Sequence, residues 1–581
     1  MADVTIPKLG VLITPEFDSN AHAVSLLVSL IIESPALLQD QILVTFPSTF
    51  SCVCTEQELD VSDEQGALPI VFEDQEKSAD RSWLPARKSI GDVRIRYKVI
   101  PSAKDQFKTD GPVLGLHSEK GGLLGSGFAL IPVPPPKEYR NIVQWDLSRA
   151  PKGTRAVWTY GEGPRLIERV GAACILRDSV YMVGQIEGTR AAANYGYYWF
   201  GNLPPNIEVI KDIHESFFTH VQKFFETDVN ESEDIDHPFF ANVPKGIKQC
   251  LVEPTPHRSF VRYTSSYKSF GGTSFGHSHI FNYDDQIGKA KDYDLIRRMA
   301  YEMSHIWLGP SAVEGVDWLY EGIKNCLSIY MPFRHQGPRS GHYFQATINM
   351  LCTRYYTSPL ISLPFEDILK LAPTNAYARE HVGARAWAFV VGVDMRARQL
   401  AKGKLKTIRP VEDIAMIPLA NNKSRGDAHG IKEWIKFLIP IMGGEIQQRY
   451  DDFCNGTIIL LPESLYGAKT HYLKQFDQPI LDFGMDRESF STGVVTGLKM
   501  DSRAGFTGLM DGDEILRSSH EWRCVDDDNA AMDLEIVKKG VRRKIRYLPR
   551  AFEMAKSWEM VKRDEQELKA FEESLATKVK R

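Results

Sequence analysis

Cysteine is scarce in this sequence, and no two cysteines have metal-binding spacing. Only eight occur among 581 residues, and no Cys-x-x-Cys pair is present. This absence excludes the common cysteine zinc sites and thiol–disulfide redox motifs. We expect reduced thiols, mostly in the protein core. The amino terminus, Met1-Ala2-Asp3-Val4, lacks the features of a signal peptide, so a cytoplasmic location is expected.

Long apolar runs and an excess of positive charge are also lacking. The stretch from Val24 to Ile32 is too short to cross a bilayer, so no membrane span is expected. The net charge is -5, from 70 basic and 75 acidic side chains, and we expect no nucleic-acid partner. Gly-x-Ser-x-Gly and nucleotide-binding glycine motifs are absent, which leaves serine-hydrolase chemistry and nucleotide binding without support.

The first third of the chain has the pattern of a β domain. Short apolar runs alternate with polar residues and are separated by Gly, Pro and Asp clusters. The segments Gln41–Phe46, Val93–Val99 and Phe128–Val133 are examples, and each predicts a β-strand. Residues 1–198 are therefore predicted to form a β-rich, sandwich-like or saddle-like N-terminal domain.

The rest of the chain changes pattern twice. Residues 199–470 contain most of the amphipathic stretches and predict a mainly helical domain. Residues 471–550 return to short strands and Gly-rich turns, and residues 551–581 are charged, contain no proline and predict a terminal helix. The expected fold class is therefore multi-domain α+β.

Two predicted helices in the middle of the chain carry chemically informative residues. The helix between Asp292 and Leu308 contains Tyr301-Glu302-Met303-Ser304-His305. This segment is one residue away from His-Glu-x-x-His, in which two imidazoles one turn apart bind zinc and the Glu activates the bound water. The next helix carries Glu321, which can face the first helix as a carboxylate ligand.

These motifs resemble those of the glycyl-aminopeptidase-like gluzincin metallopeptidases. That family combines a β N-terminal domain, a thermolysin-like or aminopeptidase-like domain and a C-terminal PDZ domain. Its motifs, His-Glu-x-x-His-x-Trp and Trp-x-x-Glu-Gly, are matched here by Tyr301, Glu302, His305, Trp307, Trp318, Glu321 and Gly322. The resemblance implies a gluzincin-like domain at residues 199–470. It also implies that Tyr377, with looser spacing, corresponds to a tyrosine that stabilises the tetrahedral intermediate.

A second resemblance concerns residues 471–550. The run from Gly508 to Leu516, Gly-Leu-Met-Asp-Gly-Asp-Glu-Ile-Leu, is similar to a PDZ domain. The resemblance implies that the loop Phe483, Gly484 and Met485 offers backbone amides to the carboxylate of a peptide or protein ligand. The alternative is that this domain only packs against the helical one or supports a dimer.

Two departures from the family pattern weaken a zinc aminopeptidase interpretation. Tyr301 replaces the first zinc-binding histidine, and a phenol binds zinc poorly unless it is ionised. The family strand that holds the substrate's amino terminus, Gly-Gly-Leu-Glu-His, corresponds to a segment without an acidic residue. That candidate substrate-binding segment is Gly271, Gly272, Thr273, Ser274 and Phe275, followed by His277. His277 and His279 are candidates for a replacement ligand.

Three functional hypotheses remain open from the sequence. The favoured one is a metal-independent acid/base catalyst built from Tyr301, Glu302 and His305, acting on a small metabolite in biosynthesis without a cofactor. Cyclisation, isomerisation, dehydration and epimerisation suit such a cluster. The second is a zinc aminopeptidase that uses His305, Glu321 and a substitute ligand on short peptides. The third is a non-catalytic pseudopeptidase that binds a peptide or protein partner.

Overall fold

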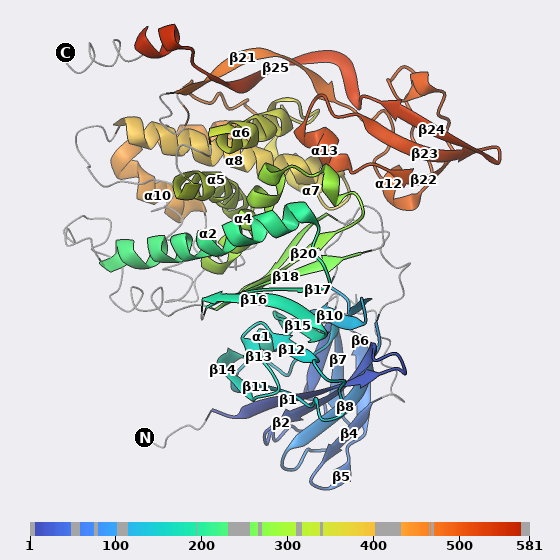
Figure 1. The fold of residues 1–581 in the computed structure, drawn as a ribbon. Coiled ribbons are helices and arrows are strands. Elements are labelled where there is room, and N and C mark those ends of the chain that lie inside the picture. The colour runs from blue at the N-terminus through green and yellow to red at the C-terminus, as the bar shows by residue number, and fades with distance from the viewer. Residues whose placement is uncertain are drawn as a thin grey trace. The chain divides into compact units, whose positions relative to one another are not determined.

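The computed structural model describes twelve stretches of the chain (Figure 1). They are residues 6–47, 59–74, 80–101, 114–192, 194–230, 256–264, 270–308, 317–336, 341–400, 431–463, 465 and 470–570. The chain divides into two compact units, residues 1–211 with 254–288 and residues 212–253 with 289–581. The predicted domain boundaries at residues 198, 470 and 550 remain predictions.

Four β-sheets make up most of the first unit. The largest has the strand order β14 (Ile167–Ala172), β11 (Glu138–Trp145), β1 (Lys8–Phe17), β2 (Ala23–Ile32), β8 (Val93–Val99), β4 (Asp60–Asp63) and β5 (Gly66–Ala67). A three-stranded sheet has the order β3 (Val44–Pro47), β7 (Asp80–Pro85) and β6 (Ile70–Asp74).

The other two sheets of this unit have five strands each. One has the order β13 (Gly161–Glu162), β12 (Arg155–Trp158), β15 (Val180–Gly184), β10 (Gly122–Ser126) and β9 (His117–Glu119). The other has the order β16 (Ile186–Ala192), β17 (Tyr195–Phe200), β18 (His257–Tyr263), β20 (Ser278–Tyr283) and β19 (Gly271–Phe275). A short helix, α1 (Cys174–Arg177), also belongs to this unit.

Residue alternation explains why these strands form. In β8, Val93, Ile95, Tyr97 and Val99 are buried, and the basic residues between them are exposed. Side chains of a strand point alternately to its two faces, so this sequence buries one face and solvates the other. The strand predicted at Val93–Val99 is confirmed, and the strand predicted at Gln41–Phe46 is present as the shorter β3.

The second unit contains a layer of helices. Their bounds are α4 (Asp292–Leu308), α5 (Asp317–Gln336), α6 (Gly341–Tyr356), α7 (Phe365–Leu371), α8 (Ala376–Leu400), α10 (Ile431–Met442) and α11 (Glu445–Cys454). Helix α2 (Pro205–Asn230) runs from the first unit into the second along the chain. Helix α5 packs against α4, α6 and α8, so it lies at the centre of the layer. The mixed β-rich and helical architecture confirms the coarse α+β prediction.

Helices α5 and α8 approach each other closely at a glycine. A Cβ added to Gly322 would lie 2.7 Å from the carbonyl oxygen of Ala386, so any side chain would force the helices apart. Trp318, one turn earlier, stacks on Phe453 with ring centroids 4.6 Å apart and contacts Phe389. The Trp-x-x-Glu-Gly segment thus fixes the position of α5, and with it the position of Glu321.

The C-terminal segment has its own small core. A three-stranded sheet consists of β22 (Glu514–Ser518), β23 (Met532–Lys538) and β24 (Val541–Tyr547), accompanied by the short helices α12 (Ser489–Thr492) and α13 (Glu521–Asp526). A two-stranded ribbon pairs β21 (His471–Leu481) with β25 (Arg550–Lys562) (Figure 1). Phe483 and Met485 are buried in this core. That this segment is a PDZ domain remains a prediction.

Two predictions of secondary structure are wrong. Phe128–Val133 is not a strand, because Gly127–Ala129 form a 3-10 turn whose glycine fits against the carbonyl oxygen of Leu176. The terminal helix predicted over 551–581 is the strand β25 up to Lys562, and a helix follows only at residues 565–570; residues 571–581 lie outside the described ones. Pairing with β21 overrides the helix propensity of this charged segment.

No helix in the part of the chain that the structure describes is long and apolar enough to cross a membrane. Of the eight cysteines in the sequence, five lie among the described residues as free thiols: Cys174, Cys326, Cys352, Cys454 and Cys524.

Candidate active site

Two adjacent helices of the second unit carry the residues that resemble a zinc motif. Tyr301 and His305 are one turn apart on α4 and share a face of that helix. Glu302 follows Tyr301 and is 8% exposed. Glu321 comes from the first turns of α5, which packs directly against α4. The expectation that the second helix presents Glu321 to the first is confirmed.

A lysine completes the cluster. The Tyr301 hydroxyl donates a short hydrogen bond to Oε2 of Glu321. The Nζ of Lys324 donates to Oε1 of Glu321 at 2.8 Å and lies 3.3 Å from Nε2 of His305. Lys324 is 5% exposed, so its charge is placed inside the protein beside two groups that can accept its hydrogen bonds. It thus links Glu321 to His305.

Burial and charge set the protonation states of the cluster. Burial, reinforced by the Lys324 charge, lowers the pKa of His305 from 6.5 to about 3, so the imidazole is neutral at neutral pH. Burial raises the pKa of Tyr301 well above 10, and the negative charge of Glu321 adds to this rise. At neutral pH the site therefore holds a neutral phenol and a neutral imidazole.

This arrangement does not fit a bound zinc ion. Zinc needs free lone pairs on the imidazole and the carboxylate, and a tyrosine at the third position binds zinc well only when its phenol is ionised. Here the Tyr301 phenol keeps its proton and donates a hydrogen bond to Glu321, while Lys324 also donates to Glu321 and contacts His305. Within the described ranges no group of three or more His, Cys, Asp or Glu is arranged to hold a metal.

Sequence reasoning missed Lys324. The signal was nevertheless present, because Lys324 follows Glu321 by three residues on a predicted helix, and residues at this spacing share a helix face. The two side chains form an ion pair at 2.8 Å. A lysine that shares a helix face with a predicted zinc ligand indicates that the lysine, rather than a metal ion, supplies the positive charge beside that carboxylate.

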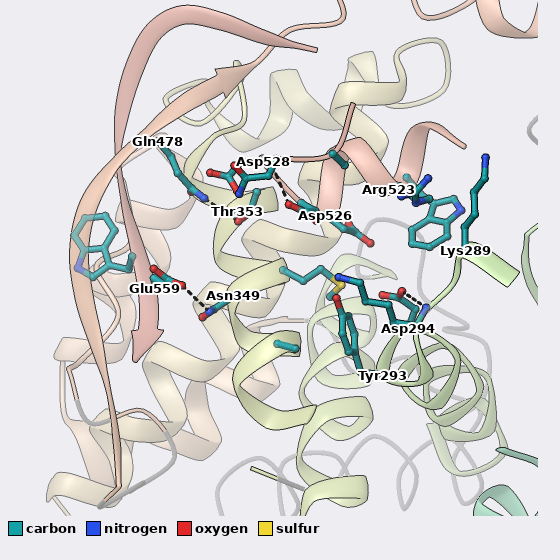
Figure 2. Close-up of a pocket in the computed structure, with 18 of the residues that line it drawn as sticks. Lys289, Tyr293, Asp294, Asn349, Thr353, Gln478, Arg523, Asp526, Asp528 and Glu559 are labelled. Atoms are coloured by element: carbon teal, nitrogen blue, oxygen red, sulfur yellow. Dashed lines mark hydrogen bonds between the residues drawn. The ribbon is translucent and has the colours of Figure 1, made fainter. Parts of the chain in front are cut away.

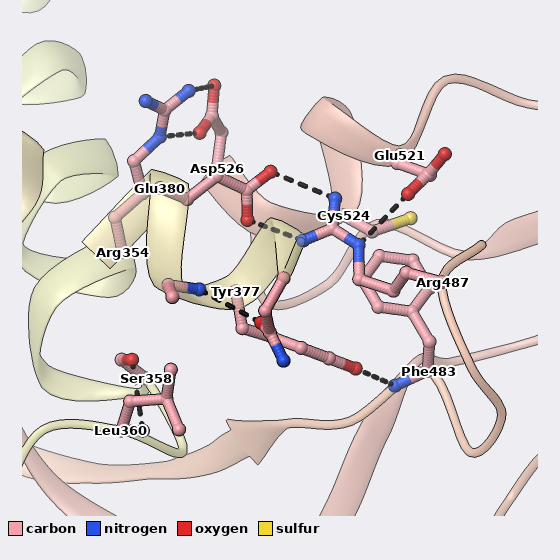
Figure 3. Close-up of polar contacts among 12 residues, drawn as sticks. Arg354, Ser358, Leu360, Tyr377, Glu380, Phe483, Arg487, Glu521, Cys524 and Asp526 are labelled. Atoms are coloured by element: carbon pink, nitrogen blue, oxygen red, sulfur yellow. Dashed lines mark hydrogen bonds and ion pairs between the residues drawn. The ribbon is translucent and has the colours of Figure 1, made fainter. Parts of the chain in front are cut away.

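Tyr377 lies at the start of α8, next to the C-terminal segment (Figure 3). Its hydroxyl accepts a hydrogen bond of 3.0 Å from the backbone amide of Phe483, and its ring packs in the same core as Phe483. The guanidinium of Arg487 lies 5.1 Å from the centre of the Tyr377 ring. A catalytic role for Tyr377 remains a prediction; the contacts of this hydroxyl are those of a structural link.

The loop predicted to bind a peptide carboxylate uses its amides within the chain. The amide of Phe483 donates to Tyr377, and the amide of Gly484 donates to Oδ1 of Asp482 at 2.9 Å. Phe483 is fully buried, and Met485 is 4% exposed. A peptide carboxylate would have to displace both internal acceptors.

The candidate substrate-binding segment belongs to the first unit. Gly271, Gly272, Thr273 and Ser274 lie on β19, which is the edge strand of its sheet, and His277 lies in the turn after it. The Nδ1 atom of His279 is 3.0 Å from Nε2 of His257, and His279 is fully buried. The roles of these residues in substrate binding remain predictions.

Solved structures identify the fold. An aminopeptidase N family protein from Idiomarina loihiensis matches with a TM-score of 0.59 and 13% identity, covering 97% of this chain and 99% of that chain. At this identity the match establishes the fold, which is that of an aminopeptidase N family protein.

Two further solved structures match more weakly. An M1 zinc metallopeptidase from Deinococcus radiodurans has a TM-score of 0.40 at 11% identity, covering 78% of this chain and 96% of that chain. Native leukotriene A4 hydrolase from Saccharomyces cerevisiae has a TM-score of 0.43 at 12% identity, covering 80% of this chain and 68% of that chain. No protein-family model matches the sequence, and no curated protein sequence matches it.

Proposed function

We propose that this protein is a metal-independent acid/base catalyst on a peptidase-like scaffold, acting on a small metabolite. The observation that carries the proposal is the position of Lys324, whose Nζ lies 2.8 Å from Glu321 and 3.3 Å from His305. A fixed ammonium group can stabilise negative charge that develops on a substrate oxygen, which is one of the tasks that a metal performs in a hydrolase.

Each residue of the cluster has a role in this proposal. Glu302 acts as the general base, and the neutral Tyr301 phenol is a proton donor or a hydrogen-bond donor to a developing oxyanion. Lys324 stabilises that oxyanion, and the neutral His305 orients Lys324 by accepting its hydrogen bond. Glu321 holds both donors, Tyr301 and Lys324, in place.

The chemistry favours proton transfer over amide hydrolysis. An ammonium group polarises a carbonyl less strongly than a zinc ion, and hydrolysis of an amide needs strong polarisation. Proton abstraction next to a carbonyl, with protonation elsewhere, needs only a base, an acid and a charge that stabilises an enolate. The reactions proposed are therefore cyclisation, isomerisation, dehydration or epimerisation.

Comparative metabolite profiling tests this proposal. The purified full-length chain is incubated with a cell metabolite extract in the presence of a chelator, and consumed and formed compounds are recorded by mass spectrometry. We expect conversion of a small set of compounds by the wild type, and loss of that conversion in Tyr301→Phe and Glu302→Gln. Glu366→Gln, on the exposed side of α7, is the matched control and should convert the same compounds.

Two outcomes would contradict the proposal. Conversion in a parallel incubation without the chelator, but not in its presence, would support the zinc aminopeptidase alternative. An absence of any conversion, together with capture of a peptide that depends on the Phe483 loop, would support the pseudopeptidase alternative. The internal use of the Phe483 and Gly484 amides argues against that second outcome.

A further inference from the structure

A polar cavity lies in the second unit, between helix α6 and the C-terminal segment (Figure 2). Its volume is about 320 Å³, at the lower end of the range of about 300 to 1,000 Å³ that small-molecule sites span. The start of α4, helices α6 and α13, and the strands β21 and β25 contribute to its wall. The residues described above as the candidate active site do not line it, so the cavity is a separate candidate site.

Charged side chains of both signs are mixed in the cavity wall. Asp294 in the first turn of α4 accepts a hydrogen bond of 3.0 Å from the amide of Lys291, and both residues line the cavity. Arg523 and Asp526 both belong to α13, and Asp526 is also paired with Arg354, whose Nη2 donates to its Oδ2 at 2.9 Å. A ligand with a strong net charge would meet groups of its own sign here. The wall therefore favours a neutral ligand.

One buried side chain of the wall has an oxygen without a donor. Gln478 is 4% exposed, and its Nε2 donates to Oγ1 of Thr353 at 3.2 Å (Figure 2). Its Oε1 is buried and receives no hydrogen bond from any residue that the structure describes. Buried polar atoms of folded proteins nearly always have a partner. We therefore expect a ligand group that donates a hydrogen bond at this oxygen.

A second acceptor lies within reach of the same small ligand. Glu559 is exposed on β25, and its Oε1 accepts only a long hydrogen bond, 3.4 Å, from Nδ2 of Asn349. Asn349 and Thr353, which contact Glu559 and Gln478, are one turn apart on α6, a rise of about 6 Å. Hydroxyls on opposite sides of one six-membered ring span such a distance. One ring can thus donate to both acceptors.

Aromatic side chains form the apolar part of the wall. Trp558 and Phe476 come from the C-terminal ribbon, and Trp522 comes from α13. Tyr356 packs on Trp558 with ring centroids 4.3 Å apart, which helps to hold the indole in place. A pyranose ring has C–H groups on its flat side, which pack on aromatic rings, and hydroxyls at its edge, which both donate and accept hydrogen bonds. Aromatic rings beside amides and carboxylates match both features.

We propose that this cavity binds a neutral sugar, as a single pyranose unit beside Gln478. One hydroxyl donates to Oε1 of Gln478, another donates to the carboxylate of Glu559, and the flat side of the ring packs on Trp558. The mixed charges of the remaining wall leave this neutral ligand without repulsion. The proposal does not rest on the function proposed above, because it uses a different set of residues.

Saturation-transfer nuclear magnetic resonance with the full-length protein tests the ligand class. The probes are the methyl pyranosides of glucose, galactose, mannose and N-acetylglucosamine. Two controls accompany them: 2-(hydroxymethyl)tetrahydropyran, which has the ring but no ring hydroxyls, and pentane-1,5-diamine, which is an organic cation. We expect at least one glycoside to bind about tenfold or more tightly than both controls, since the controls lack the set of neighbouring hydroxyls.

Three results would overturn the proposal. The first is that no glycoside binds at millimolar concentration. The second is that 2-(hydroxymethyl)tetrahydropyran binds as tightly as the glycosides, which would show that the ring hydroxyls make no important bonds. The third is tighter binding of pentane-1,5-diamine than of every glycoside, which would show that the cavity takes organic cations instead.

Variants locate the binding of the glycoside that binds most tightly. Gln478→Leu removes the buried acceptor, and Glu559→Gln replaces a charged acceptor with little change of shape; each should weaken binding about tenfold. Gln475→Leu, at an exposed position of the same strand as Gln478, is the matched control and should leave binding unchanged. Thermal melts check that the variants fold, and Glu559→Gln carries the test alone if Gln478→Leu does not fold.

A final variant separates this cavity from the candidate active site. Glu302→Gln changes the catalytic cluster and should leave glycoside binding unchanged, because Glu302 does not line the cavity. Binding that survives Gln478→Leu and Glu559→Gln but is lost in Glu302→Gln would overturn the proposal. It would place the sugar in the active site instead.

Discussion

At the scale of single residues, the most informative group is Lys324. Its ammonium contacts the carboxylate and the imidazole that a zinc site would use, and the Tyr301 phenol occupies the remaining ligand position. These hydrogen bonds run between members of the cluster, and the Lys324 ammonium balances the charge of the Glu321 carboxylate. We infer that Tyr301 and Lys324 act together, because each removes a requirement for a metal.

Tyr301→Phe tests the hydrogen bond between the two helices. The change removes the donor to Glu321 and leaves that carboxylate oxygen with one partner fewer, while the ring still fills its space. We expect the free energy of unfolding to fall by about 1 to 3 kcal/mol, measured by denaturant titration. An unchanged stability would show that the hydroxyl forms no important bond with Glu321.

Buried histidines should make the folded protein less stable in acid. His305 and His381 in the second unit and His117 in the first each have a pKa lowered by burial to about 3. The unfolded chain binds protons at these groups as the pH falls below 6.5, whereas the folded chain does not, so stability is lost between about pH 6.5 and 3. Denaturant titrations across this range should show the loss.

Lys324→Met tests whether the Lys324 ammonium helps to lower the pKa of His305. Removal of the ammonium removes one of the two causes that lower the pKa of His305, so that pKa should rise. Proton titration of the His305 ring followed by nuclear magnetic resonance measures it directly. A pKa that is the same in the wild type and in Lys324→Met would show that the two groups do not interact.

The convergence of Tyr301, His305 and Glu321 could be predicted from the sequence, because helical spacing places them on facing surfaces of two helices. The spacing of Lys324 from Glu321 also predicts that the two share a helix face, but a zinc motif contains no position for a cation. The internal partners of Phe483 could not be predicted. They depend on a contact with Tyr377, which is 106 positions away in the chain.

At the scale of helices and strands, the close approach of α5 and α8 supports the site. Gly322→Ala places a Cβ 2.7 Å from the Ala386 carbonyl oxygen, and the helix backbone cannot yield easily. We expect a destabilisation of about 1 to 3 kcal/mol by denaturant titration, accompanied by loss of activity as Glu321 moves. Gly383→Ala on α8 is the matched control, because the nearest atom to its new Cβ is 3.6 Å away.

If Gly322→Ala is as stable as Gly383→Ala, the packing described for α5 is wrong.

Two strands show where local sequence patterns predict secondary structure and where they fail. The strand β8 has strict alternation and was predicted correctly, whereas β25 has helix-forming residues and becomes a strand through its partner β21. Lys556 pairs across that ribbon with Asp477 at 2.7 Å, a contact that no local pattern reveals.

At the scale of the whole molecule, the second unit joins a helical layer to the C-terminal segment through buried ion pairs (Figure 3). Arg487 is 6% exposed in its side chain and donates to Glu380 on α8 at 2.6 and 2.9 Å. It also donates to Glu521 on α13 at 3.0 Å. One guanidinium thus connects the helical layer with the C-terminal core.

Arg487→Met tests this connection. Removing the guanidinium leaves two carboxylates without their buried partner, and we expect a loss of about 3 to 5 kcal/mol in the stability of the second unit. Scanning calorimetry should show a lower melting temperature or a separate transition for the C-terminal segment. Arg542→Met, whose ion pair with Glu535 is largely exposed, is the control and should change little. Equal melting temperatures of the two variants would show that Arg487 does not stabilise the connection between the helices and the C-terminal segment.

The metal content of the protein tests directly whether the cluster of Tyr301, His305, Glu321 and Lys324 works without zinc. The wild type and the double variant Tyr301→His with Lys324→Ala are purified without chelators or metal-carrying tags, analysed by mass spectrometry for metals, and titrated with zinc. The account predicts no bound zinc in the wild type and stoichiometric zinc in the double variant, in which two histidines and Glu321 are free to bind it. Stoichiometric zinc in the wild type, lost in Glu321→Ala, would contradict it.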